Sequence, residues 1–216
     1  MRSMKFIPAS FAATVPALLF VASCNALGDP KPPLQIYDLS AGSGIQSQAG
    51  ERIAVNIIVD EPDVSRVLDS ERILVRLKTN ELRYLPQSRW SDRAPRLLQL
   101  SLIEAFTRAG RVMGTGAPSS SFRGDYRIEG YLRSFEAVAA DGKMQMHIGF
   151  DVQLVAEKAA RIVNVRSFDA QAQAASENPS DVTRAMDTAL AALFADIVPW
   201  THAQIDADLQ AQPLRR

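Results

Sequence analysis

The sequence predicts an α+β fold: a single domain with a mainly antiparallel, twisted sheet and two long helices packed on one face of it. Segments that alternate apolar and polar residues recur along the chain, most regularly over residues 143–154, and this period of two is typical of half-buried strands. Two other segments, residues 95–109 and 180–199, carry apolar side chains at helical spacing. A sheet with one polar and one apolar face needs a cover for the apolar face, and the two helices supply it.

Residues 1–23 have the layout of a secretory signal. Arg2 and Lys5 precede an apolar run that ends at Phe20, and small residues follow it up to Cys24, the single cysteine among 216 residues. A cysteine at this place resembles the processing site of bacterial lipoproteins, where the thiol receives a diacylglyceryl group. We therefore predict Cys24 as a lipidation site. An ordinary signal peptide with a chance cysteine, or a short buried helix, is the alternative interpretation.

Composition and charge exclude several classes of protein. Removal of residues 1–23 leaves 193 residues, within the range of one domain, with 22 basic and 24 acidic side chains. This balance does not support nucleic-acid binding. Lipidation of Cys24 leaves no thiol for a disulfide or a thiolate metal site. No later run approaches the roughly 18 apolar residues of a transmembrane helix, so acyl chains would be the strong membrane attachment.

The chain divides into a signal (residues 1–23), a lipidated proline-rich tether (24–33), one α+β domain (34–205) and a C-terminal tail (206–216). Three prolines in the tether favour an extended conformation with a reach of about 28 Å. Asn25 stands where an aspartate would resemble a retention signal for the inner membrane. We therefore predict a lipid-anchored protein on the periplasmic face of the outer membrane.

Strands are expected at residues 34–39, 52–59, 72–78 and 81–85, the last of which ends at Pro86. A helical turn is expected over residues 64–68, and a small, polar loop over residues 114–124. The clearest hairpin begins at Tyr126 and returns through residues 143–154, with Asp141 and Gly142 as a two-residue turn. Residues 161–170 are expected as a third strand of the same meander.

The first helix is expected to begin with Ser91 or Asp92 as its cap, to hold Pro95 in its first turn and to end before Gly110. Leu97 and Leu100 fall near its polar side, where they are possible contacts for a partner. Cover by another part of the same domain is the alternative that the sequence favours.

The second helix is expected to begin near Ser180. Pro199 should kink or end it, because proline removes a helical hydrogen bond, and the chain from Ile205 onward is expected to fray.

No catalytic constellation is visible. The two histidines, His147 and His202, are far apart in sequence, and no nucleophile elbow, phosphate loop, zinc-protease or calcium-loop pattern accompanies them. His147 falls on the polar side of its strand, and His202 follows Pro199 near a predicted helix end, where a solvated or capping role is as plausible as any other. The sequence therefore predicts a protein that is not an enzyme and has no cofactor and no metal.

The order of these features resembles a known family, the ABC-type transport auxiliary lipoproteins (the PqiC-like group). The resemblance covers nearly all of the mature chain and depends on the spacing of its motifs. These are Cys24, Tyr37-Asp38-Leu39 on the first strand, Tyr84, Arg89-Trp90 before the first helix, Gly110 after it, the long hairpin, and a terminal helix ending around Trp200.

The resemblance implies a non-enzymatic component of a transporter that moves lipids between the two membranes of a Gram-negative envelope. Its implied partners are a periplasmic MCE-domain protein with the associated inner-membrane permease, and the outer membrane through the lipid anchor. A symmetric ring of this protein is a further expectation. The alternative function is a regulatory or scaffold lipoprotein for cell-wall synthesis or outer-membrane assembly.

Overall fold

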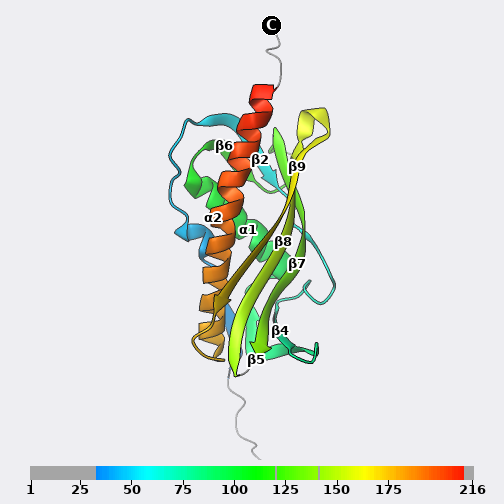
Figure 1. Ribbon diagram of the computed structural model, residues 1–216, viewed down its shortest axis with the longest axis vertical. Coiled ribbons are helices and arrows are strands. Elements are labelled where there is room, and N and C mark those ends of the chain that lie inside the picture. Colours follow the sequence, from blue (N-terminus) through cyan, green and yellow to red (C-terminus); the bar gives the residue numbers. More distant parts are fainter. Residues whose placement is uncertain (1–32, 120, 141, 212–216) are drawn as a thin grey trace, which may run out of the picture. The chain divides into compact units, whose positions relative to one another are not determined.

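The computed structural model describes residues 33–119, 121–140 and 142–211. Cys24, most of the tether, Asp141 of the hairpin turn and residues 212–216 therefore lie outside the described residues. The predicted fold class is confirmed: a nine-stranded mixed, mostly antiparallel sheet is covered on one face by two helices (Figure 1). The strands are β1 (Gln35–Tyr37), β2 (Ile53–Val59), β3 (Asp63–Val64), β4 (Arg72–Leu77), β5 (Leu82–Trp90), β6 (Val112–Gly116), β7 (Tyr126–Ala140), β8 (Lys143–Ala156) and β9 (Arg161–Gln173). The helices are α1 (Ala94–Ala109) and α2 (Pro179–Ala211), with short 3₁₀ turns η1 (Ala41–Gly44) and η2 (Glu157–Ala159).

The long strand β7 is the centre of the sheet. On one side it pairs with β8 along its whole length, from Tyr126 opposite Ala156 to Ala140 opposite Lys143. On its other side β2, β3 and β4 follow one another, each parallel to β7. β9 extends the sheet beyond β8 as the predicted third strand of the meander. The path β1-β5-β4-β7-β8-β9 is therefore continuous, with β1 and β9 at its two ends, and β2 carries β6 as a further edge strand.

Three stretches differ from the sequence-based expectation. Residues 63–64 pair with β7 before the expected turn, and residues 112–116 form β6 in place of the expected loop. Gly114 allows β6 to lie close to β2, because a Cβ there would come within 2.9 Å of the side-chain oxygen of Asn56. β5 does not end at Pro86 but continues to Trp90. Pro86 sits where four residues of β5 bulge opposite one residue of β4, so its missing N–H breaks no ladder bond.

The cap of α1 lies one residue after Asp92, the later of the two expected caps. Its N-cap is Arg93, and neither Ser91 nor Asp92 caps it: the Ser91 hydroxyl donates to Asp38, and Asp92 accepts from the Arg93 N–H. The predicted proline in the first turn is present. The predicted end is also confirmed, because Gly110 adopts φ 72° and its N–H donates to the Phe106 carbonyl.

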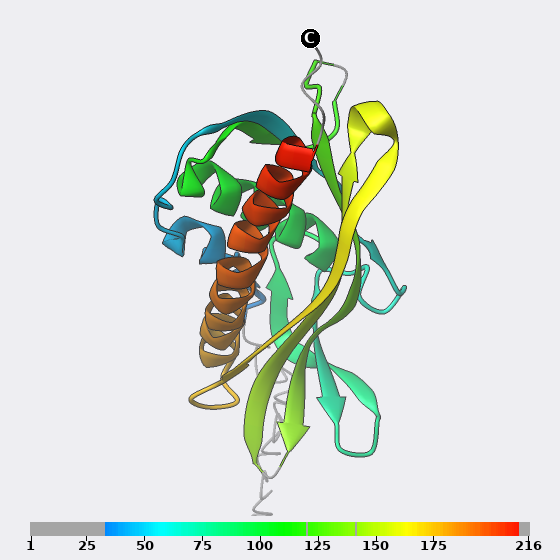
Figure 2. The ribbon, with the colours of Figure 1, turned by 45° about the horizontal axis from the view of Figure 1, so that its top comes forward.

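α2 contradicts the expected end at Pro199 and the expected fraying from Ile205. The helix continues through the proline to Ala211 and appears as one ribbon across β8 and β9 (Figure 2). Proline removes only the bond to the carbonyl of Ala195, whereas both sides of it are held by packing: Val198 and Ile205 have no exposed surface. Burial therefore outweighs local propensity here.

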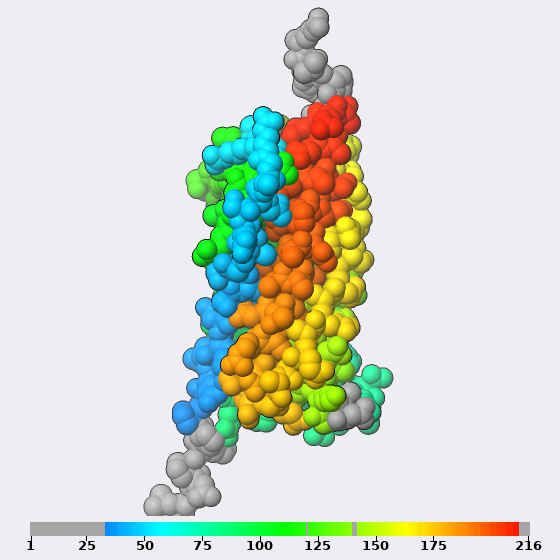
Figure 3. All heavy atoms as spheres, turned by 60° about the vertical axis from the view of Figure 1, so that its left-hand side comes forward, coloured from blue at the N-terminus to red at the C-terminus, as the bar shows by residue number. Residues whose placement is uncertain are grey.

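The core lies between the sheet and the two helices. The inward side chains of β8 are those that the alternation predicted, and each is at most 7% exposed: Met144, Met146, Ile148, Phe150, Val152 and Leu154. Large side chains from the other elements fill the remaining space; Trp90 meets Phe135 edge-on at 5.8 Å between ring centroids. A segment of residues 40–52 runs over the seam between α1 and α2, as Figure 3 shows in blue and cyan beside the orange helix.

Candidate interaction surfaces

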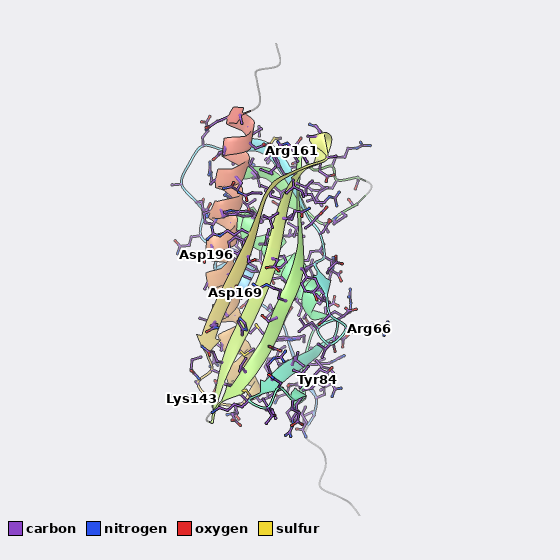
Figure 4. All side chains as sticks on the ribbon, turned by 45° about the vertical axis from the view of Figure 1, so that its right-hand side comes forward. Arg66, Tyr84, Lys143, Arg161, Asp169 and Asp196 are labelled. Atoms are coloured by element: carbon purple, nitrogen blue, oxygen red, sulfur yellow. The ribbon has the colours of Figure 1, made fainter. Side chains whose placement is uncertain are left out.

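The face of β7, β8 and β9 that no helix covers is the first candidate surface, and we call it the helix-free face. It carries a charge network over three strands, seen around Asp169 in Figure 4. Arg133 donates to Asp151 and to Asp169, each at 2.8 Å, and His147 Nε2 lies 3.4 Å from Asp169. The Arg133 guanidinium is the main cause that lowers the pKa of Asp169. His147 therefore lies on the polar side of its strand, as predicted.

A second pair on this face is more deeply buried. The Arg76 guanidinium donates twice to the Glu136 carboxylate, at 2.7 and 3.0 Å, and the Glu136 side chain is only 5% exposed. This hydrogen bond raises the pKa of Arg76. Every charge named on the face has a partner of opposite sign. The arrangement suits a binding surface or a structural role better than proton transfer. Proton transfer needs a titratable side chain whose pKa is tuned to the reaction by burial or by neighbouring charges.

The end of the domain where β7 starts and β8 ends, which we call the η2 end, holds a surface hollow of about 380 Å³. Arg127 lines the hollow and donates to Asp60 at 2.7 Å and to Glu157 at 2.6 Å. The walls include Ile58, Phe122, Arg123 and Lys158. Arg123 is exposed, and no described residue pairs with its guanidinium.

Asp125 anchors the loop that enters β7. One carboxylate oxygen accepts from the Lys158 ammonium at 2.8 Å, and the other accepts from the Asn56 N–H at 3.0 Å. Burial acts to raise the pKa of Asp125, but these two donors together outweigh burial and leave the pKa below its usual value. The rim of the hollow is thus fixed to both β2 and η2.

Asp208 joins the last turns of α2 to the sheet. It is 7% exposed, accepts from the Tyr126 hydroxyl at 2.9 Å and is paired with Arg161. Burial is the larger cause that raises the pKa of Tyr126, and the hydrogen bond to Asp208 raises this pKa further. These contacts involve a part of the helix beyond the predicted domain boundary at residue 205, so sequence reasoning missed this junction.

His202 is a buried side chain, which corrects the expected solvated or capping role. Its ring has no exposed surface, packs edge-on against Phe106, and places Nδ1 2.8 Å from the side-chain oxygen of Gln48. No described residue bonds to its Nε2. Burial lowers the pKa of His202 to about 4, and nearby Arg111 acts in the same direction against the weaker effect of Asp206.

The predicted site residues lie in different parts of the molecule. Cys24 lies outside the described residues. Leu97 is 5% exposed and belongs to the core, whereas Leu100 is 43% exposed on the outer side of α1. Only Leu100 of this pair is therefore accessible to a partner. Within the described ranges, no group of three or more histidine, cysteine or acidic side chains is placed to hold a metal ion, and no helix is long and apolar enough to cross a membrane.

These observations describe an α+β domain with a filled core and a surface on which most of the charges named here form ion pairs. The sequence matches the family model of the ABC-type transport auxiliary lipoprotein component over residues 37–198, and the chain belongs to that family. The description of that family is an auxiliary lipoprotein component of ABC-type transport.

Two solved structures and one curated protein are similar to this chain. The crystal structure of XCC0632 from Xanthomonas campestris superposes with a TM-score of 0.74 at 24% identity, covering 82% of this chain and 100% of that one. The crystal structure of an uncharacterised protein gives a TM-score of 0.61 at 12% identity, covering 78% and 98% of the two chains. The uncharacterised protein bll6063 of Bradyrhizobium diazoefficiens is 23% identical over 165 residues, 76% of this chain; the match spans only 44% of that relative.

Proposed function

We propose that this protein is an outer-membrane lipoprotein, anchored through Cys24 with its domain in the periplasm, and a non-enzymatic component of an MCE/ABC-type lipid transport system. In this role it docks the end of a periplasmic tunnel protein, an MCE-domain protein whose permease lies in the inner membrane. Family membership is the observation that carries the proposal. The charged-apolar-small order of residues 1–23 before Cys24 supports the anchor.

The filled interior supports docking over carriage of lipid by the domain itself. The space between the sheet and the helices is occupied by large side chains that are at most 2% exposed, among them Phe106, Phe135 and Phe194. The η2 end is the docking surface we propose, because its hollow combines the apolar ring of Phe122 with the Arg123 guanidinium, which has no partner among the described residues. A tether of about 28 Å cannot cross the periplasm, so transport between membranes requires such a bridging partner.

A closed ring of this protein would suit a ring-shaped tunnel, because weak contacts that repeat around a ring add through effective concentration.

In-cell photocrosslinking of the full-length protein tests the docking. A photoreactive residue at Arg123 should crosslink to an MCE-domain protein, and one at exposed Thr188 on α2 serves as the control. Leu100 and His147 are second positions for mapping the surface. Crosslinks from these positions to cell-wall synthases alone would overturn the transport proposal in favour of a scaffold role.

The anchor has its own test. Cys24→Ala in the full-length protein should abolish incorporation of a clickable fatty acid and release the protein from the membrane fraction, because the thiol that carries the lipid is gone. Cys24→Ser offers a second variant without a thiol. Continued labelling of either variant would overturn Cys24 as the lipid site. Density separation of the two membranes, with the unaltered protein, checks the outer-membrane assignment.

A further inference from the structure

β9 offers an open edge of backbone donors and acceptors. The Ala174 N–H donates to the Met144 carbonyl at 2.9 Å, which fixes the even-numbered residues of this segment as those bonded to β8. In an antiparallel ladder the alternate residues then face away. These are the exposed residues Ser167, Asp169, Gln171 and Gln173, and no described residue bonds to their backbone groups.

This part of β9 also lacks the usual protection of an edge. Natural edge strands carry lysines, prolines or bulges that prevent another strand from adding to them. Residues 167–173 contain one charged residue, Asp169, and no proline or glycine, and the shift in register lies outside them, near Ile162. Unpaired N–H and C=O groups at regular spacing are satisfied by another extended backbone, so the edge fits a strand.

β1, at the other end of the sheet path, has the matching features. The Ser91 N–H donates to the Tyr37 carbonyl at 2.7 Å, which turns Tyr37 towards β5 and leaves the backbone groups of Ile36 at the open edge. Leu34 and Ile36 lie on one side of the strand, opposite Tyr37, which packs against the core. Leu34 and Ile36 are each 56% exposed, so together they form an apolar pair next to the open edge of β1.

Strand directions decide how two copies can meet. β9 runs in the direction of β7 and β4, whereas β1 and β5 run the opposite way. Two copies in the same orientation therefore bring β1 of one antiparallel to β9 of the next. Antiparallel pairing of β9 with β9 would instead turn one copy end over end. Because β1 runs parallel to β5, its first residues lie towards the β4–β5 turn. In such a pair the two β1 starts would lie at opposite ends, which does not suit two chains anchored to one membrane.

We propose that β1 of one copy adds antiparallel to residues 167–173 of β9 in a second copy, and that this contact repeats head to tail. Leu34 and Ile36 would then lie on the helix-free face of the neighbour, with reduced exposure. Pro33 has no N–H, so only a few hydrogen bonds form per contact, and each contact is weak alone. Because the two edges differ, the interface is heterologous and forms a ring if the rotation closes. The proposal of this interface rests on the ring and on the membrane anchor proposed above, with all copies anchored to one membrane.

Disulfide crosslinking of the full-length protein in its membrane tests the interface. Ile36→Cys is combined in turn with Ser167→Cys, Gln171→Cys or Gln173→Cys, and mild oxidation should give a ladder of dimers, trimers and larger species that ends at one size. Each single variant, and the pair Ile36→Cys with Thr188→Cys, should give no ladder. Dimers from Gln171→Cys alone would show β9–β9 pairing and overturn the proposal. Absence of a ladder from all three pairs would overturn it as well.

A proline variant keeps this test independent of cysteine chemistry. Ser167→Pro removes an N–H at the open edge and leaves the β8 ladder intact, so it should raise the concentration for half-assembly about tenfold, while Ser167→Ala should not. Native mass measurement of the full-length protein in detergent separates the two proposals. A closed oligomer unaffected by Ser167→Pro would overturn the β1–β9 interface but keep the ring. A monomer for the unaltered protein would overturn both, without bearing on docking to a transporter.

Discussion

The two faces of the β7–β8–β9 sheet are built from alternate residues of the same strands, yet they contribute unequally to stability. On the covered face the side chains of β8 lie under α2 and bury large apolar areas, each worth about 1.5–3 kcal/mol. On the helix-free face the charges of Arg133, Asp151 and Asp169 meet in ion pairs that are one third to one half exposed. Such pairs contribute about 0–1 kcal/mol each. The covered face therefore contributes most of the stability, and the exposed part of the helix-free face around Arg133 is available for contacts.

The largest expected effect comes from a charge placed on the covered side. Leu193 on α2 is 1% exposed, so Leu193→Asp buries a carboxylate without a partner, at a cost of several kcal/mol. Because a whole domain is stable by about 5–15 kcal/mol, we expect loss of cooperative thermal unfolding. Ala192→Asp, at the exposed neighbouring position, is the matched control and should change stability by about 0.5 kcal/mol or less. Equal melting behaviour of the two variants would contradict the packing of α2.

The seam between α1 and α2 is expected to be sensitive to acid. The pKa of His202 is lowered from 6.5 to about 4 in the folded protein, so the unfolded chain binds its proton first. Stability is complete above pH 6.5 and falls as the pH drops towards 4, by about 2–3 kcal/mol in all. Urea unfolding at pH 7 and at pH 4.5 measures this loss.

His202→Gln keeps a polar side chain that can bond to Gln48 but cannot titrate. Its stability should fall less between these two pH values than that of the unaltered protein. Other carboxylates, such as Asp169, have lowered pKa values and lose their contribution only at lower pH, so they affect both proteins equally. An identical loss in the two proteins would show that His202 is not the group that titrates.

The sequence was informative where one interaction dominates. The alternation over residues 143–154 predicted the covered side of β8, because burial there depends on periodicity alone. Pro199 predicted a helix end wrongly, because local propensity does not include the packing that holds α2 on both sides of the proline. β3 has only two residues, too few for the alternation of apolar and polar side chains that identifies a strand. The network around Arg133 was not predictable, because its members come from three strands whose alignment depends on a bulge next to Arg133 itself.

The smallest expected effect concerns that network and tests the comparison most directly. Arg133→Gln removes the charge but keeps a polar side chain over Gly149, and the remaining carboxylates of Asp151 and Asp169 stay solvated. We expect a loss of at most about 1 kcal/mol, and less in high salt, because exposed pairs are screened. Arg76→Gln is the contrasting variant, since it leaves the buried carboxylate of Glu136 unpaired and should cost about 2 kcal/mol or more. Both losses are measured by urea unfolding at pH 7 in low and high salt. Both pairs lie on the helix-free face, so the two variants separate burial from exposure within it. If Arg133→Gln proved as costly as Arg76→Gln, the exposed pairs would stabilise the fold as much as the buried pair, and the small contribution assigned to them would be wrong.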